Sequence, residues 1–132
     1  MNRPVNNRFV SVAVEPVRHL ATVTRSAQRP DSVEQIASAF DEAIEALDQL
    51  DRKRLRLLID LRAAPGRNDS EFERAMATRR SELMRDFAAV AILVQTPVGE
   101  LQVARITRED GAAAKVFNDE AKALDWLVTT KP

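Results

Sequence analysis

Residues 55–61 read LRLLIDL, and this short apolar run decides the fold. It lies between two segments with helical periodicity. A continuous apolar run of this length in such a setting is typical of a strand in a parallel sheet whose two faces are covered by helices. Residues 88–94 form a second run of the same kind. We therefore expect two parallel strands at the centre of an α/β domain.

The segments on either side of these strands have the 3.6-residue periodicity of amphipathic helices. Apolar residues recur at that spacing over residues 33–50, and Ser32 with Gln35 forms a capping-box pattern ahead of them. A second helix is expected between the two strands, where Ser70 and Glu73 repeat the pattern. Its apolar face comprises Phe72, Ala75, Met76, Leu83, Met84 and Phe87.

The two ends of the chain complete the pattern. Residues 8–14 and 17–24 are rich in β-branched residues and flank a break at Pro16, which predicts a hairpin. A helix over residues 100–108, a strand over 114–117 and a last helix to about residue 128 follow. The predicted order is β-β-α-β-α-β-α-β-α. It implies one α/β domain over residues 1–132, with a mainly parallel sheet, an antiparallel N-terminal edge strand and helices packed on the sheet.

Composition excludes several classes of site. The 132 residues include no Cys and one His, so disulfides, Cys-bound zinc, iron–sulfur clusters and multi-His metal sites cannot form within the chain. Lys and Arg total 20, as do Asp and Glu, which does not favour a nucleic-acid partner. We expect no cofactor and no metal. Neither a signal peptide nor an integral membrane segment is apparent, so we expect a cytoplasmic protein.

The order of elements resembles the STAS domain, the fold of the bacterial SpoIIAA-type anti-sigma-factor antagonists, and the related SpoIIAA-like proteins. Three stretches carry the resemblance: residues 57–62, which read LLIDLR; the loop leading to NDS at residues 68–70; and VFNDEAKALDWL at residues 116–127. The resemblance implies a non-enzymatic signalling protein. It also implies a Ser phosphorylated by a partner kinase at the start of the second helix. Asp69-Ser70 matches the first half of that motif, whereas Glu71-Phe72 replaces the second half.

Ligands of parallel α/β sheets gather at the carboxyl ends of the strands. The loop over residues 62–70 and the loop over residues 96–99 are expected to meet there. Helix N-termini favour anions, and arginines strengthen such sites. The alternative is that Asp69 or Ser70 only caps the helix while the arginines are solvated. The candidates for binding a partner or an anion are Asp60, Arg62, Arg67, Asn68, Asp69, Val98 and Gln102, and Ser70 is the candidate for phosphorylation.

Other patterns have an ordinary structural interpretation beside a functional one. Asp60 ends a buried strand, as catalytic acids often do, or hydrogen-bonds the following loop. A Ser–His–Asp triad through His19 is disfavoured, because no activating motif surrounds the serines. The arginines of the second helix either bind an acidic partner or, as we favour, form a solvated face with intrahelical ion pairs. The cations of residues 52–56 are interpreted in the same way, as a solvated basic turn in preference to a nucleic-acid patch. The methionines of that helix belong to the core or line a lipid cavity.

Three functions remain open on the sequence. The first is a non-enzymatic signalling or scaffold module that binds a protein partner, such as a regulator, a kinase or a cytoskeletal component, like an anti-sigma-factor antagonist. The second is a carrier or sensor of a small apolar ligand, such as a lipid, or of an anion. The third is an enzyme that uses Asp60. A homodimer through the first edge strand is also open.

Overall fold

The computed structural model describes residues 2–65, 70–109 and 113–129, with only the backbone of residues 2 and 3. The strands are β1 (Asn2–Asn6), β2 (Val10–Glu15), β3 (Leu20–Arg25), β4 (Arg56–Asp60), β5 (Ala89–Leu93) and β6 (Ala114–Phe117). The helices are α1 (Val33–Asp48), the 3-10 helix η1 (Arg52–Arg54), α2 (Ser70–Met84), α3 (Pro97–Glu109) and α4 (Glu120–Thr129).

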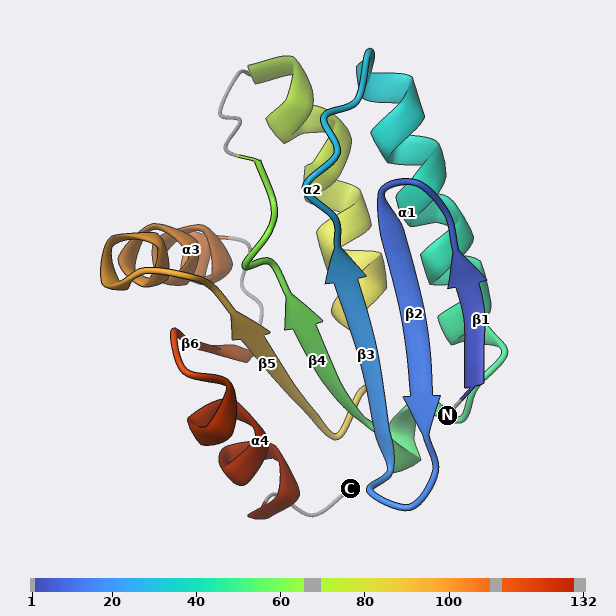
Figure 1. Cartoon of the computed structure of the whole chain (residues 1–132), viewed down its shortest axis with the longest axis vertical. Helices are drawn as coiled ribbons and strands as arrows, with labels where there is room; N and C mark the ends of the chain where they lie inside the picture. Colours follow the sequence, from blue (N-terminus) through green and yellow to red (C-terminus); the bar gives the residue numbers. More distant parts are fainter. Residues whose placement is uncertain (1, 66–69, 110–112, 130–132) are drawn as a thin grey trace.

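The strands form one mixed sheet in the order β1-β2-β3-β4-β5-β6, as Figure 1 shows. β2 is antiparallel to both of its neighbours, β1 and β3, whereas β3, β4, β5 and β6 run parallel to one another. The expected fold class is confirmed: the chain is an α/β domain whose antiparallel strands come from the N-terminus. The two central apolar runs are β4 and β5, and both are almost wholly buried.

One strand more than the sequence predicted lies at the antiparallel edge. β1 pairs with β2, and its register shifts between Asn2 and Val5. Asn and Pro are poor strand formers, so this segment shows little strand propensity of its own. Its edge position explains how Pro4 is accommodated, because an edge strand leaves one row of backbone groups unpaired.

The turn between β2 and β3 is longer than the predicted break. The His19 N–H donates to the Pro16 carbonyl at 3.1 Å, and His19 has a φ of 52°, in the left-handed region. The Arg56 N–H in turn donates to the His19 carbonyl at 2.8 Å, which ties the turn to the start of β4. The only histidine therefore serves the turn, and it is exposed.

The two faces of the sheet are covered differently. α1 and α2 pack on one face, where the largest core cluster includes Ile36, Leu47, Leu57, Met76 and Ile92. α4 covers the other face with Ala123 and Leu127, which pack on Leu58, Ala91 and Leu93. Met76 is thus a core residue, in agreement with the interpretation that the methionines of the second helix belong to the core.

Arg52 joins the ends of three segments. Its side chain is 5% exposed, and Nη1 donates to the carbonyls of Glu82, Leu83 and Arg85 at 2.9–3.0 Å. These are carbonyls at the C-terminus of α2, which lack partners within the helix. Nη2 donates to Asp48 of α1 at 2.9 Å. The interpretation of residues 52–56 as a solvated basic turn was therefore wrong for Arg52 and also for Arg56, which is 9% exposed.

The arginines of α2 also depart from the expected pattern. Arg79 forms a two-bond ion pair with Asp41 of α1, and Arg85 donates to Asp48 of α1 at 2.6 Å. The expected pairing at a spacing of three residues does occur between Glu82 and Arg85, which directly follows the helix, at 3.1 Å. Several of these arginines thus pair with carboxylates of α1. Residue spacing within one helix does not reveal such long-range ion pairs.

Candidate functional site

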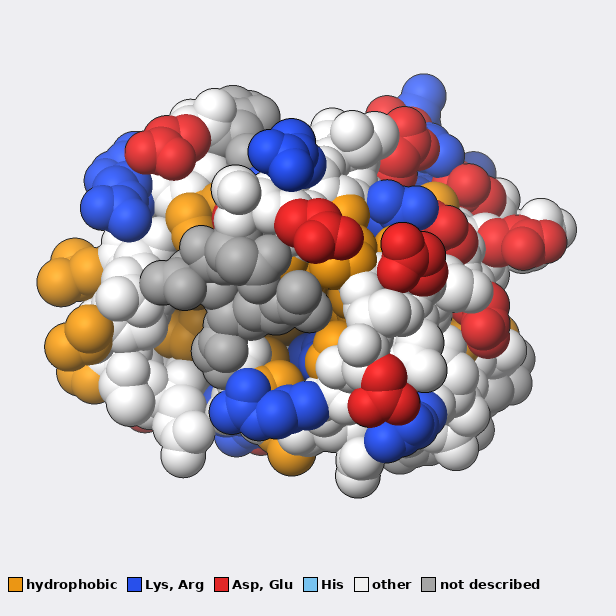
Figure 2. Space-filling model, turned by 90° about the horizontal axis from the view of Figure 1, so that it is seen from above, with side chains coloured by type: hydrophobic (Ala, Val, Ile, Leu, Met, Phe, Trp, Pro, Cys, Tyr) orange, Lys and Arg blue, Asp and Glu red, His pale blue; other side chains and the backbone are white. Residues whose placement is uncertain are grey.

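The carboxyl ends of the parallel strands lie side by side. Beyond the strands, the Leu61 N–H donates to the Leu93 carbonyl at 2.8 Å, and the Val94 N–H donates to the Phe117 carbonyl at 2.9 Å. This end of the sheet is called the carboxyl-end face below. It comprises the described residues that directly follow β4, β5 and β6, together with the first turns of α2, α3 and α4. Figure 2 views the molecule from this side. The described parts of the two predicted loops follow adjacent strands, β4 and β5, as expected.

Asp60 and Arg62 form a closed pair on this face. Asp60 Oδ1 accepts hydrogen bonds from the Arg62 N–H and Nε, both at 3.0 Å, and Oδ2 accepts from Nη2 at 2.8 Å. Arg62 Nη2 also reaches Glu120 Oε1 at 3.5 Å, at the start of α4. The guanidinium that we considered for binding an anion thus already faces two carboxylates.

The electrostatics of the pair follow from this geometry. Burial of the Asp60 carboxyl raises its pKa, but the hydrogen bonds and charge of Arg62 together outweigh burial, so the pKa lies below its ordinary value. The same hydrogen bonds raise the pKa of Arg62. A carboxylate held in this way is a weak base, and it stays ionised at neutral pH. Asp60 therefore performs the loop-bonding role that was the alternative to a catalytic one.

Ser70 is exposed and is the first residue of α2. The capping position before it falls on Asp69, which with Arg67 and Asn68 lies outside the described residues. Glu73, expected to complete a capping box with Ser70, instead accepts from Arg80 Nη1 at 3.3 Å. Accessibility of the hydroxyl at a helix start is compatible with phosphorylation.

α3 begins at Pro97, three residues before the predicted start. Thr96 Oγ1 accepts from the Gly99 N–H at 3.0 Å, the bond of an N-cap residue. Proline fits the first helical position, because its fixed φ suits the helix and its missing N–H would have no partner there. The prediction that residues 96–99 form a loop was therefore wrong for Pro97, Val98 and Gly99. In the helix, Glu100 Oε2 accepts from Asn118 Nδ2 at 2.6 Å, which links α3 to the end of β6.

The first turns of α3 present apolar side chains to solvent. Val98 is 64% exposed and Leu101 is 74% exposed. The predicted candidate Gln102 is exposed beside them. Sequence reasoning did not single out Leu101. Its spacing of three residues from Val98 would have revealed it, had residue 98 been placed in the helix. In Figure 2, hydrophobic side chains protrude on the side where α3 lies.

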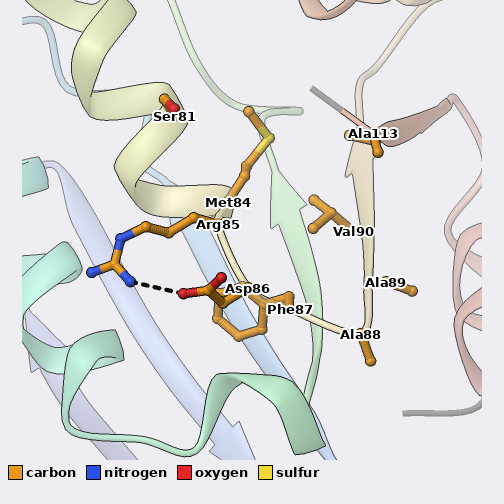
Figure 3. Close-up of a pocket in the computed structure, with 10 residues that line it drawn as sticks. Ser81, Met84, Arg85, Asp86, Phe87, Ala88, Ala89, Val90 and Ala113 are labelled. Carbon is orange, nitrogen blue, oxygen red and sulfur yellow. Dashed lines mark hydrogen bonds and ion pairs between the residues drawn. The ribbon is translucent and has the colours of Figure 1, made fainter. Parts of the chain in front are cut away.

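A shallow pocket lies at the opposite end of the sheet. Figure 3 shows Met84 lining it from the end of α2, Phe87 from the segment that follows α2, and Val90 from β5. Its volume is about 330 Å³, at the lower limit for small-molecule sites. Arg85 and Asp86 form an ion pair of 3.1 Å beside it. Of the expected methionines, only Met84 lines this pocket.

Two further features bear on function. Among the described residues, no group of His, Asp and Glu side chains is arranged to hold a metal ion. None of the helices in the described part of the chain is both long and apolar enough to cross a membrane.

Comparison with known proteins gives the fold. No protein-family model matches the chain, and neither does any curated protein. An uncharacterized protein of the DUF3478 family from Shewanella loihica, with a SpoIIAA-like fold, matches with a TM-score of 0.63 and 19% identity, over 96% of this chain and 98% of that one. An anti-sigma-factor antagonist (STAS) domain protein from Planctomyces limnophilus matches with a TM-score of 0.60 and 22% identity. The match covers 92% of this chain and 99% of that one.

The chain therefore has the SpoIIAA-like, or STAS, fold, as the resemblance in its sequence implied. At these identities, the matches establish the fold and leave the function to be argued from the site.

Proposed function

We propose that this protein is a non-enzymatic interaction module that binds a protein partner through the carboxyl-end face, chiefly through the first turns of α3. The observation that carries the proposal is the pair of exposed apolar side chains, Val98 and Leu101, at the start of α3. Neighbouring exposed apolar side chains rimmed by polar groups are typical of protein–protein contact sites. The Planctomyces protein of the same fold is an anti-sigma-factor antagonist (STAS) domain protein.

The state of Asp60 supports an interaction module over an enzyme. Its carboxylate is engaged by Arg62 and has a lowered pKa, so it is poorly suited to proton transfer at neutral pH. The same pairing reduces the capacity of Arg62 to bind a free anion. An adjacent ion-paired surface is a suitable polar rim for the apolar contact of α3.

The experiment that tests this proposal is site-specific photo-crosslinking in the cells that produce the protein. A photoreactive residue replaces Leu101 in one variant and Val17 in the other. Val17 is 89% exposed and lies on the turn between β2 and β3, far from α3 in Figure 1, so it is a matched exposed apolar control. We expect a discrete protein adduct from position 101 and none from position 17. No adduct from position 101, or the same adducts from both, would contradict the proposal.

Phosphorylation of Ser70 is proposed as the regulation of this surface. The hydroxyl is exposed in the first turn of a helix, where the dipole tolerates a phosphate, although Glu71 and Glu73 would oppose it. Intact-mass measurement of the chain purified from its own cells should show a phosphate adduct that a Ser70→Ala variant lacks. An unmodified mass under every growth condition would refute this regulation.

The pocket beside Met84 and Phe87 favours a second candidate function, the carriage of a small apolar ligand. Native mass spectrometry of the purified protein should then show a bound small molecule. An Ala113→Trp variant, which places a large side chain at an exposed position in the lining of the pocket, should lose it while keeping its thermal unfolding transition. A chain that carries no small molecule would leave this second function without support.

A further inference from the structure

We infer that the partner of α3 is a second copy of this chain, which receives α3 in a groove between β1 and α1. This inference rests on the proposed function, because it names the occupant of the same surface. It predicts head-to-tail association, in which the α3 edge of one molecule meets the β1 edge of the next.

The contacting stripe of α3 contains two kinds of side chain. Val98 and Leu101 supply its apolar part, and Arg105 and Arg108 continue it at intervals of four and three residues, which is one face of a helix. All four side chains are exposed. Neither guanidinium has an ion-pair partner among the described residues, whereas Arg79 and Arg80 of α2 do. A surface complementary to the stripe is therefore apolar at one end and acidic at the other.

The groove between β1 and α1 has this composition. It has a volume of about 550 Å³ and is open to solvent. Val5, Ala46 and Leu50 supply apolar walls, and Glu42 and Glu45 are exposed beside them. Glu42 Oε1 accepts one long hydrogen bond of 3.4 Å from Asn7 Nδ2, and Glu45 has no ion-pair partner among the described residues.

The order of these residues along the two helices also matches. Along α1 towards its N-terminus, the groove passes from Leu50 and Ala46 to Glu45 and Glu42. Along α3 towards its C-terminus, the stripe passes from Val98 and Leu101 to Arg105 and Arg108. At a rise of about 1.5 Å per residue, the groove spans roughly 12 Å and the stripe roughly 15 Å. An antiparallel arrangement of the two helices thus sets apolar against apolar and basic against acidic.

The placement of the two surfaces selects head-to-tail contact over a symmetric one. β1 and β6 are the two edges of the sheet, with the groove at β1 and α3 beside β6. Figure 2 shows acidic side chains gathered on the side of α1, opposite the protruding hydrophobic side chains at α3. Two copies of α3 packed antiparallel about a twofold axis would instead bring arginines against apolar residues. A heterologous contact of this kind generates rings or open chains of molecules.

Analytical ultracentrifugation of the purified chain tests the inference. We expect the weight-average sedimentation coefficient to rise with protein concentration at about 50 mM salt and to rise less at about 500 mM, because exposed charges are screened. One variant, Glu42→Lys/Glu45→Lys, impairs the groove, and another, Val98→Gln/Leu101→Gln, impairs the stripe. Each should weaken association by roughly tenfold or more.

Mixing the two variants gives a sharper test. Each retains one intact surface, so the mixture should form a 1:1 dimer and nothing larger. A control with the same change of charge, Glu34→Lys/Asp125→Lys, alters exposed acidic residues that do not line the groove, and it should associate like the unmodified chain. Thermal unfolding of every variant verifies that the fold is retained.

Several outcomes would overturn the inference. One is an unmodified chain that stays monomeric at all concentrations. Another is weakening by the α3 substitutions alone, which would indicate a symmetric α3–α3 contact. If the chain is monomeric but position 101 crosslinks to a different protein in cells, the proposed function stands and self-association fails. If position 101 crosslinks to nothing, both fail.

Discussion

The carboxylate of Asp60 forms an ion pair with Arg62, only two positions further along the chain. Arg62 covers both carboxylate oxygens, and the pair is part of the rim of the carboxyl-end face. The pKa of Asp60 in the folded protein lies below its value in the unfolded chain, which is about 3.9. The stabilisation is therefore complete above about pH 4 and is lost as the pH falls through the lower, folded-state pKa.

An Asp60→Asn variant should show this dependence. At pH 7 its free energy of unfolding should be lower than that of the unmodified chain by about 1 kcal/mol, a modest value because Arg62 is partly exposed. The difference should disappear below the folded-state pKa. Urea unfolding from pH 7 down to about pH 2.5 measures it. A variant of the exposed Asp125, Asp125→Asn, is the control, and a difference that persisted equally at the lowest pH would refute the assignment.

Arg52 should contribute far more to stability than the exposed arginine of the same 3-10 helix, Arg54. Its guanidinium satisfies three carbonyls at the end of α2 and the carboxylate of Asp48, and it lies 5.0 Å from the ring centre of Phe87. An Arg52→Met variant leaves those acceptors without a donor. We expect the free energy of unfolding to fall by about 3 kcal/mol. Arg54→Met, at a highly exposed side chain of the same 3-10 helix, should change it by less than about 0.5 kcal/mol.

Equal unfolding free energies for these two variants would show that burial of Arg52 does not matter. The sequence gives no sign of the difference between them. Both arginines belong to one run of cations, and only the approach of α2 in the folded chain decides which of them is buried.

α3 depends on its first turn more than the other long helices do. Thr107 is the only fully buried residue among its described side chains, so packing holds the helix weakly. Its start is fixed by the hydrogen bond between Thr96 Oγ1 and the Gly99 N–H. A Thr96→Ala variant should lose about 1 kcal/mol of stability, whereas Thr96→Ser should retain most of it. Thermal unfolding compares the two, and equal losses would show that the hydroxyl does not cap the helix.

The elements that packing determines were the ones that sequence predicted well. β4 and β5 lie within the two apolar runs, and β6 has the predicted bounds, because burial imposes a pattern on residues of such strands. The pattern of α1 was also predicted, and Ser32 accepts from the Gln35 N–H as the capping motif indicates. β1 and the start of α3 were missed, since edge pairing and a capping bond are set by neighbours in space.

The candidate site was predicted only in part, for a related reason. The rule for parallel sheets placed the carboxyl-end face correctly, and Asp60 and Arg62 lie on it. The approach of Glu120 to Arg62 joins residues 58 positions apart, which no local pattern reveals. Leu101 was not singled out, because the predicted start of α3 at residue 100 left Val98 outside the helix and hid their shared face.

The whole molecule is asymmetric, because the two edges of its sheet carry different kinds of surface. α1 and α2 cover one face together, and α4 covers only part of the other. Ser11, Ala13, Thr22 and Thr24 on the second face of β2 and β3 are only partly buried. The well-packed centre of the domain is thus the region of β4 and β5, and the surfaces proposed for binding lie at its margins.

The buried guanidinium of Arg52 has a consequence for local opening of the native protein. One side chain holds the end of α1, the 3-10 helix and the last turn of α2, so none of these ends can fray without releasing the others. They should behave as one cooperative unit. In native-state hydrogen exchange, amides at the end of α2 and those following η1 should share one opening free energy. Arg52→Met should lower that value for both segments together.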